Sequence, residues 1–160
     1  MTDKMKLDPI DARILSILQV DATVSVQELG ERVGLSSTPC WRRIKALEAS
    51  GVIDRRVAVL NPAAIGLEGV VFIFVRTSQH DALWLERFAA AIEAVREIVE
   101  CHRLSGDIDY LLKARVRDIA HYDDVYKRLI RHAPGLSDVS AAFSMERLKE
   151  ATAVDVATAR

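Results

Sequence analysis

The stretch Ser36–Gly51, SSTPCWRRIKALEASG, decides the fold of the first third of the chain, because it describes a short helix with two unlike faces. Ser36 or Ser37 can cap the start of this helix with a hydroxyl oxygen. Pro39 is tolerated in a first turn, and Gly51 ends the pattern. At 100° per residue, two sets of side chains fall on opposite arcs, which are the apolar set Cys40, Ile44 and Leu47 and the polar set Thr38, Arg42 and Lys45. The stretch therefore predicts one packed face and one exposed, basic face.

Two further helices are predicted before this one. Asp8 can cap the first, with Pro9 at its first position, and apolar residues then recur at helical spacing. Ser25 and Glu28 have the S-x-x-E spacing of a capping box, and Gly34 can end the second helix in the left-handed conformation. A capped helix that meets a basic helix at a glycine turn predicts a helix-turn-helix.

The charge of the chain is unevenly distributed. Lys and Arg number 22 and Asp and Glu 23, so the net charge of −1 does not by itself suggest a nucleic-acid binder. Between residues 36 and 60, however, five basic residues stand against two acidic ones, namely Arg42, Arg43, Lys45, Arg55 and Arg56 against Glu48 and Asp54. Residues 52–60, VIDRRVAVL, hold two apolar runs around a charged turn and predict a hairpin that would form a basic wing.

A basic helix of this kind fits the major groove of DNA. Arg42 and Lys45 can reach guanine, and hydroxyls at the helix start can donate to phosphate. Trp41 falls between the two arcs, and we expect it to pack against the wing, although its indole N–H could also reach phosphate. The predicted DNA contacts are Ser36, Ser37, Thr38, Pro39, Trp41, Arg42, Arg43, Lys45, Arg55 and Arg56. The alternative is a solvated charged face, which the coincidence of turn, caps, helix and wing disfavours.

The rest of the chain alternates strands and helices. Extended patterns cover residues 70–76, 97–104, 108–116 and 139–145, and helical patterns cover 82–94 and the stretch from 119 to just before Pro134. The resulting order, β-α-β-β-α-β, is the ferredoxin-like arrangement. The expected fold class is α+β, with a winged helix-turn-helix over residues 1–60, a linker over 61–67 and a ferredoxin-like domain over 68–160.

The loop Ser105–Asp109 joins two predicted strands and brings two carboxylates near His102. It has three interpretations, which are a solvated turn, a ligand-binding loop, and a metal or acid–base pair. Catalysis is disfavoured because the sequence has no H-E-x-x-H, G-x-S-x-G, P-loop or G-x-G-x-x-G motif. Cys40 and Cys101 are far apart and do not form a metal or redox pair, and Cys40 is expected to be a buried small hydrophobe. No apolar run approaches the ~18 residues that cross a membrane, so we expect a cytoplasmic protein without a signal peptide.

Two separated motifs resemble the leucine-responsive/asparagine-responsive (Lrp/AsnC, feast/famine) regulators. The first consists of GLSSTPCWRRIKALE at residues 34–48 and GVI at 51–53. The second consists of ECH at 100–102 and SGDIDYL at 105–111, and PGL follows at 134–136. The resemblance covers residues 7 to about 149. Residues 38–41 and 126–129, with the stretch 134–139, look more like a branch that controls cysteine detoxification. The leucine-responsive branch usually has an aromatic residue where this chain has Ala142.

The resemblance implies a regulator that binds double-stranded DNA and an amino acid, with no other cofactor, no metal and no enzymatic activity. It also implies dimers that assemble into tetramers, octamers or hexadecamers, with the amino acid bound between dimers. The implied effector residues are Arg103, Leu104, Ser105, Gly106, Asp107, Ile108, Asp109, Ile119, Ala142, Phe143 and Ser144. Two alternatives remain, which are a small ferredoxin-like enzyme with an accessory DNA-binding domain and an architectural protein that compacts DNA without sensing a ligand.

Overall fold

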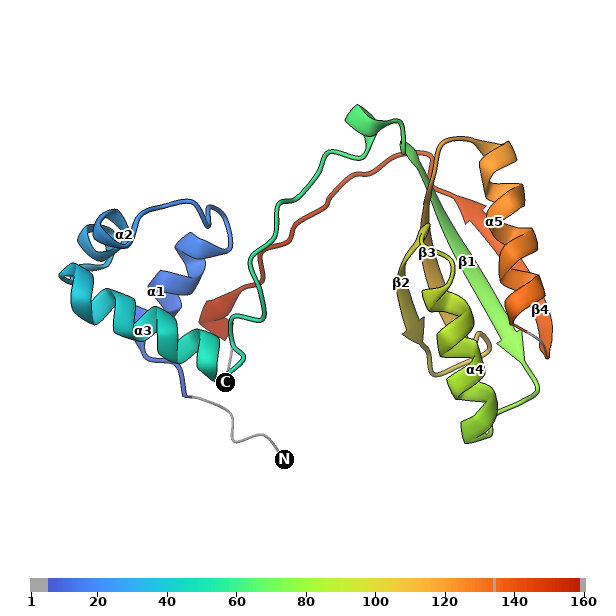
Figure 1. Ribbon diagram of the computed structural model, residues 1–160, viewed down its shortest axis with the longest axis horizontal. Helices are drawn as coiled ribbons and strands as arrows, with labels where there is room; N and C mark the ends of the chain where they lie inside the picture. The colour runs from blue at the N-terminus through green and yellow to red at the C-terminus, as the bar shows by residue number, and fades with distance from the viewer. Residues whose placement is uncertain (1–5, 134, 159–160) are drawn as a thin grey trace. The chain divides into compact units, whose positions relative to one another are not determined.

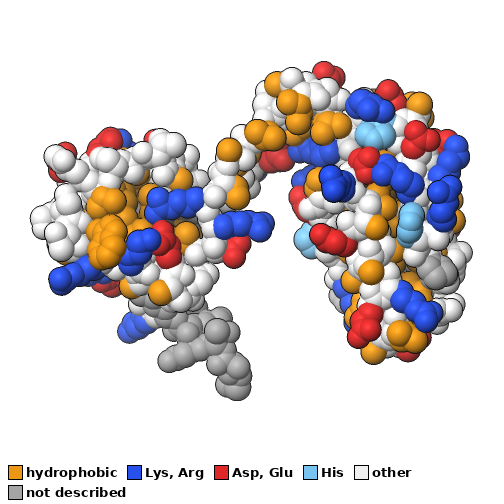
Figure 2. Space-filling view, in the orientation of Figure 1, with side chains coloured by type: hydrophobic (Ala, Val, Ile, Leu, Met, Phe, Trp, Pro, Cys, Tyr) orange, Lys and Arg blue, Asp and Glu red, His pale blue; other side chains and the backbone are white. Residues whose placement is uncertain are grey.

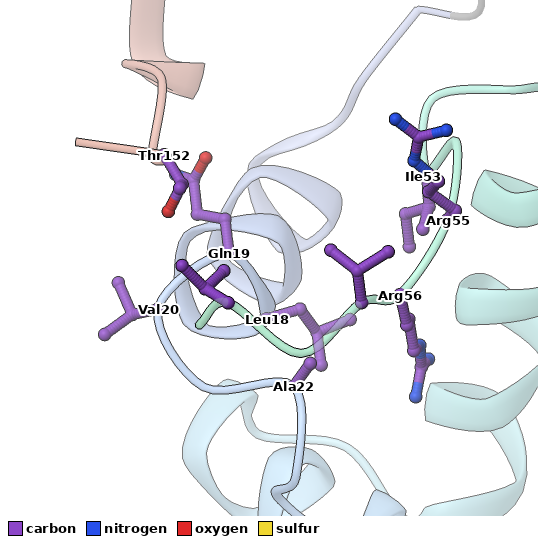
Figure 3. Close-up of a pocket in the computed structure, with 10 residues that line it drawn as sticks. Leu18, Gln19, Val20, Ala22, Ile53, Arg55, Arg56 and Thr152 are labelled. Atoms are coloured by element: carbon purple, nitrogen blue, oxygen red, sulfur yellow. The ribbon is translucent and has the colours of Figure 1, made fainter. Parts of the chain in front are cut away.

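The structure, a computed structural model, describes residues 6–133 and 135–158, and it divides the chain into two compact units. The second unit spans residues 60–147, whereas the first contains residues up to 59 together with the C-terminal segment from 148. The expected C-terminal domain therefore extended too far. The segment joins the first unit because Gln19 exchanges two 2.9 Å hydrogen bonds with the backbone of Val154, one through its Nε2 and one through its Oε1. Leu18, Ile53 and Thr152 line a pocket of about 320 Å³ beside this junction (Figure 3).

Three helices form the first unit, namely α1 (Pro9–Leu18), α2 (Val26–Val33) and α3 (Ser37–Ala49). Asp8 caps α1 through the N–H groups of Ile10 and Asp11, each at 2.8 Å. Ser25 caps α2, and Gly34 ends it with a φ of 78°, as the sequence predicted. The core holds the expected apolar arc of α3 with residues of the other two helices, and its buried members are Ile14, Leu29, Val33, Cys40, Ile44 and Leu47.

The hairpin predicted over residues 52–60 is absent. This segment contains no strand, and Val57 and Val59 are 66% and 74% exposed. A β-strand needs hydrogen bonds from a neighbouring strand, and the described part of this chain offers none to these residues. The predicted β-hairpin is therefore wrong, and residues 54–60 continue from the three helices as an extended segment without strand pairing. Among the described residues, no helix is both long and apolar enough to cross a membrane.

The second unit has the predicted β-α-β-β-α-β order. Its elements are β1 (Gly69–Thr77), α4 (Ala82–Glu93), β2 (Ile98–Arg103), β3 (Tyr110–Val116), α5 (Ile119–His132) and β4 (Leu136–Phe143), preceded by a short turn of 3₁₀ helix, η1 (Ala63–Ile65), in the expected linker. The strands form one antiparallel sheet in the order β2-β3-β1-β4. Pro134, where the second helix was expected to stop, lies outside the described residues.

Both helices cover the same face of this sheet (Figure 1). Alternate residues of β1 and β3 point into the resulting core, where they are fully buried or nearly so: Val71, Ile73, Val75, Tyr110, Leu112, Ala114 and Val116. On the opposite face Phe72, Phe74 and Leu111 are only half-buried, because no described element of the unit covers them. The unit therefore presents an open sheet face on which Phe72, Phe74 and Leu111 form an apolar patch beside charged residues such as Lys113.

Candidate functional site

The outward surface of α3 carries most of the predicted DNA contacts. Seven side chains of α3 and its N-cap are exposed: Ser36, Ser37, Thr38, Pro39, Trp41, Arg42 and Lys45. Trp41 was expected to pack against the wing, but it is 51% exposed. Residues 52–60 form no hairpin, and half of the Trp41 side chain lies exposed on the outer face of α3.

Arg43 lies apart from this surface. Its Nη1 contacts Oδ2 of Asp8 at 2.6 Å and Oδ1 of Asp11 at 2.8 Å, so it joins α3 to the start of α1. The Asp11 side chain is only 7% exposed. The backbone N–H of Asp11 and the Arg43 guanidinium lower the pKa of Asp8, while hydrogen bonds to Asp11 and Asp8 raise that of Arg43. Arg43 therefore ties α3 to the start of α1, and the DNA contact expected of it stays a prediction.

The other cations of the first unit differ in how they are paired. Lys45 donates to Glu48 at 2.6 Å, and Arg56 reaches the other oxygen of Glu48 at 3.2 Å. The hydrogen bond from Lys45 is the main reason that the pKa of Glu48 is lowered. Arg55 lies 3.5 Å from Asp54 on a fully solvated stretch. Arg42 has no ion pair with any described residue, so its guanidinium is available to a ligand.

The N-terminus of α3 also lacks a side-chain cap. The caps of α1, α2, α4 and α5 each accept a backbone N–H, whereas Ser36 makes no side-chain capping bond. Its carbonyl accepts the N–H of Cys40 at 3.2 Å, which closes the first turn. Free N–H groups at a helix start attract anions, phosphate in particular.

The implied effector residues do not come together in one chain. The loop 103–109 joins β2 to β3 at one end of the sheet, whereas Ile119 follows β3 at the opposite end. Through the register of β1, Ala142 lies level with Lys113 in the middle of β3 and Ser144 lies near Arg115. The seven residues of β3 separate the loop from Ile119 by about 20 Å. Neighbouring residues of β4 also face opposite sides of the sheet. The ring of Phe143 packs edge-on against Tyr122 of α5, with 5.2 Å between ring centroids, whereas Ala142 pairs with Phe72 on the open face. A pocket made from all of them needs residues of a second chain.

Asp109 has a structural partner within the loop. Its Oδ2 accepts the N–H of Thr77 at 2.8 Å, and its own N–H donates to Val75 at 3.0 Å. Gly106 has a φ of 137°, which only glycine adopts easily, so the tight turn depends on it. The Asp109 side chain, one of the implied effector residues, ties the loop to β1, and Asp107 is exposed.

The acids of this loop do not form an acid–base or metal site with His102. His102 Nε2 lies 3.5 Å from Glu100, and Glu100 is also bound by Lys113 at 2.6 Å, which lowers its pKa. Over the described ranges, no three His, Cys, Asp or Glu side chains are grouped as metal ligands would be.

One charged cluster in this unit joins residues that no sequence motif connects. Glu97 Oε1 accepts from Arg128 at 2.7 Å and lies 3.1 Å from Nε2 of His121. These bonds, the Arg128 bond first, lower the pKa of Glu97 to about 2. Glu97 is 31 residues from Arg128 and 24 from His121, so sequence spacing could not reveal the contact.

Comparison with known proteins agrees with this architecture. Residues 70–154 match the model of the Lrp/AsnC ligand binding domain, and residues 7–54 match that of the winged helix-turn-helix DNA-binding domain. The chain is 50% identical over 147 residues to the glutamate uptake regulatory protein of Zymomonas mobilis, covering 92% of this chain and 89% of that one.

Two solved structures are similar over nearly the whole length. An AsnC family transcriptional regulator from Agrobacterium tumefaciens is 46% identical with a TM-score of 0.92, covering 96% of this chain and 100% of that chain. The transcriptional regulator NMB0573 of Neisseria meningitidis, solved in complex with L-Met, is 32% identical with a TM-score of 0.87, covering 93% and 96%. The chain therefore belongs to the Lrp/AsnC family of transcriptional regulators, which join a DNA-binding helix-turn-helix to a ligand-binding domain and are not enzymes.

Proposed function

We propose that this regulator reads DNA through the outward face of α3 and responds to an amino acid held between copies of its second unit. The observation that carries the first part is the contrast between two adjacent arginines. Arg43 is fixed by carboxylates of α1, whereas Arg42 is exposed with no ion pair to a described residue. A fixed helix that presents a free guanidinium is suited to base recognition.

The proposed contacts divide by chemistry. Arg42 and Lys45 reach base edges, and Trp41 covers the apolar edge of a base or the sugar beside it. Ser36, Ser37 and Thr38 at the uncapped helix start bind phosphate, with Pro39 shaping that turn. Arg55 and Arg56 contact the flanking backbone. Arg43 acts as a positioning residue.

Arg42→Ala and Arg55→Ala separate base reading from backbone binding. We expect Arg42→Ala to lower affinity for the operator by about 5- to 100-fold with little change on a scrambled duplex, as for the loss of one base contact. Arg55→Ala should weaken binding to both duplexes equally and reduce the slope of the logarithm of the binding constant against log salt by about 1. Fluorescence anisotropy on both duplexes measures this, with Arg87→Ala as a control in the other unit. Unchanged discrimination in Arg42→Ala would contradict the proposal.

For the assembly, we propose that a second copy covers the open sheet face. Phe72, Phe74 and Leu111 are apolar and half-buried, and sheet faces of this kind are stabilised by packing against another layer. A two-fold pairing of identical faces gives a dimer, the commonest closed assembly. Further association of dimers brings the loop 103–109 of one copy near Ile119, Ala142 and Ser144 of another, with Phe143 packed behind them.

The length of β3 supports an effector site of this kind, since within one chain it separates the loop 103–109 from Ile119 by about 20 Å. The L-Met complex of the Neisseria protein supports an amino acid as the ligand class. Thermal-shift screening with the common amino acids tests the proposal, because a ligand at 100 times its Kd adds about 2.7 kcal/mol to folded-state stability. An architectural protein would instead be favoured if no amino acid altered the affinity for DNA and if all DNA sequences were bound equally tightly. Because its proposed ligands are genomic DNA and an amino acid, we assign its action to the cytoplasm.

A further inference from the structure

A shallow basic concavity runs along α5, and none of its lining residues belongs to the residues assigned to DNA or effector contacts above. It has a volume of about 440 Å³, and its lining side chains are Arg117, His121, Asp124, Lys127, Arg128 and Arg131. Lys and Arg side chains gather over α5 in Figure 2. From residue 121 to residue 131 these positions recur every three or four residues, so they share one side of the helix. We call these six residues the α5 stripe.

Several cations of the α5 stripe are held in place by acids. Glu97 accepts from Arg128 at 2.7 Å, and Asp123 pairs with Lys127. Lys127 nevertheless keeps 61% of its side chain exposed and Arg128 keeps 37%. Asp118 is used in capping the helix, since it accepts the N–H of His121 at 2.7 Å. The acids therefore orient these cations without covering them.

Two cations at the ends of the stripe have no such partner. Arg117 and Arg131 are exposed, and neither forms an ion pair within the described part of the chain. The backbone N–H of Arg117 donates to Nδ1 of His121 at 3.1 Å, which fixes the start of the stripe against the helix. The fourteen positions from Asp118 to Arg131 rise by about 20 Å along the helix. Two cations this far apart cannot bind one small anion together.

We propose that the α5 stripe binds the phosphate backbone of DNA, as a second contact in addition to that of α3. A duplex carries one charge per about 1.7 Å of its axis, so 20 Å of duplex carries roughly 12 phosphates on its two strands, and those on the near side can face the stripe. The elongated shape and the cations at both ends match this linear array of charge. The inference rests on DNA binding by α3, which brings a duplex to the molecule in the first place.

The double variant Arg117→Gln/Arg131→Gln tests the proposal, with Arg87→Gln/Arg96→Gln as a matched control. Both variants remove two exposed cations from the second unit. Binding is measured by anisotropy over a range of salt, on a short duplex that holds only one operator and on duplexes extended in steps beyond it. We expect the stripe variant to match the wild type on the short duplex. On a long duplex, its slope of log K against log salt should be smaller by about 1.8, or 0.9 for each lost phosphate contact. The control should match the wild type on both duplexes.

Two results would overturn the proposal. One is a stripe variant whose salt slope on long duplexes equals that of the wild type or of the control. The other is saturable binding of inorganic phosphate by calorimetry that the variant loses while its DNA slope is unchanged, which would assign the concavity to a small anion. Arg42→Ala distinguishes the α3 proposal from the α5 stripe proposal. Loss of recognition by α3 lowers affinity for the short duplex already, whereas loss of the stripe contact changes binding to the long duplex only.

Discussion

Replacing Glu97 with Gln should destabilise the second unit in a way that depends on pH. Glu97 accepts hydrogen bonds from Arg128 and His121 in a site where its side chain is only 19% exposed. These bonds lower its pKa from 4.5 to about 2. That difference corresponds to about 3 kcal/mol at neutral pH, which screening at the partly exposed Arg128 reduces to about 2 kcal/mol.

The sign follows from linkage. A carboxyl whose pKa is lower in the folded state stabilises the fold above its unfolded pKa, and this stability is lost as the pH falls through the folded pKa. The difference between wild type and Glu97→Gln should therefore be full at pH 7, begin to shrink near pH 5 and fall below half by about pH 3. A packing defect caused by the amide would instead be independent of pH.

Urea unfolding measures this difference in a Trp41→Phe background. The sequence has two tryptophans, and without Trp41 the fluorescence comes from Trp84, which is buried in the second unit. Glu93→Gln, at an exposed position of α4, is the control and should change stability little at any pH. A constant difference between wild type and Glu97→Gln from pH 7 to pH 3 would refute this account of the cluster.

Three further predictions concern the fold, the assembly and the loop. Arg43→Met leaves Asp11 buried without its cation, so it should lower stability of the first unit by about 1–2 kcal/mol and weaken binding to all DNA sequences alike, measured by thermal unfolding and anisotropy. Phe74→Asp places a charge on the open sheet face, and sedimentation should show dissociation to monomers with an unchanged circular dichroism spectrum. Asp109→Ala removes the acceptor of the Thr77 N–H and should lower the free energy of unfolding of the second unit by about 1–3 kcal/mol. Asp109→Asn keeps an oxygen at this position and should lower it less, as measured by thermal unfolding of both variants.

Most of the fold could be predicted because its elements follow local rules. The alternation in β3 gives the faces that the structure has, with Tyr110 and Leu112 buried and Leu111 and Lys113 on the open side. The cap at Asp8 and similar signals act within one turn of a helix. Such information is present in a few neighbouring residues, so a single sequence is enough to recover it.

The errors arose where a residue depends on distant partners. The alternation of residues 52–60 predicts which side chains of a strand would share a face, but a strand also needs a neighbouring strand to pair with, which this pattern cannot indicate. Arg42 and Arg43 look alike in sequence, and only Asp8 and Asp11, 35 and 32 residues from Arg43, distinguish them. The return of Val154 to Gln19 spans 135 residues. No periodicity reports contacts of this range.

The register of one strand also bears on how the regulator could sense its ligand. Because β3 holds the loop 103–109 about 20 Å from Ile119, an effector that contacts both groups can bind only when chains are assembled. Such a ligand stabilises the assembly by its own binding free energy, and assembly must in turn raise its affinity by the same factor. Apparent ligand affinity should then rise with protein concentration in calorimetry. A value independent of concentration, in a range where sedimentation shows dissociation, would place the whole site within one chain and contradict the shared pocket.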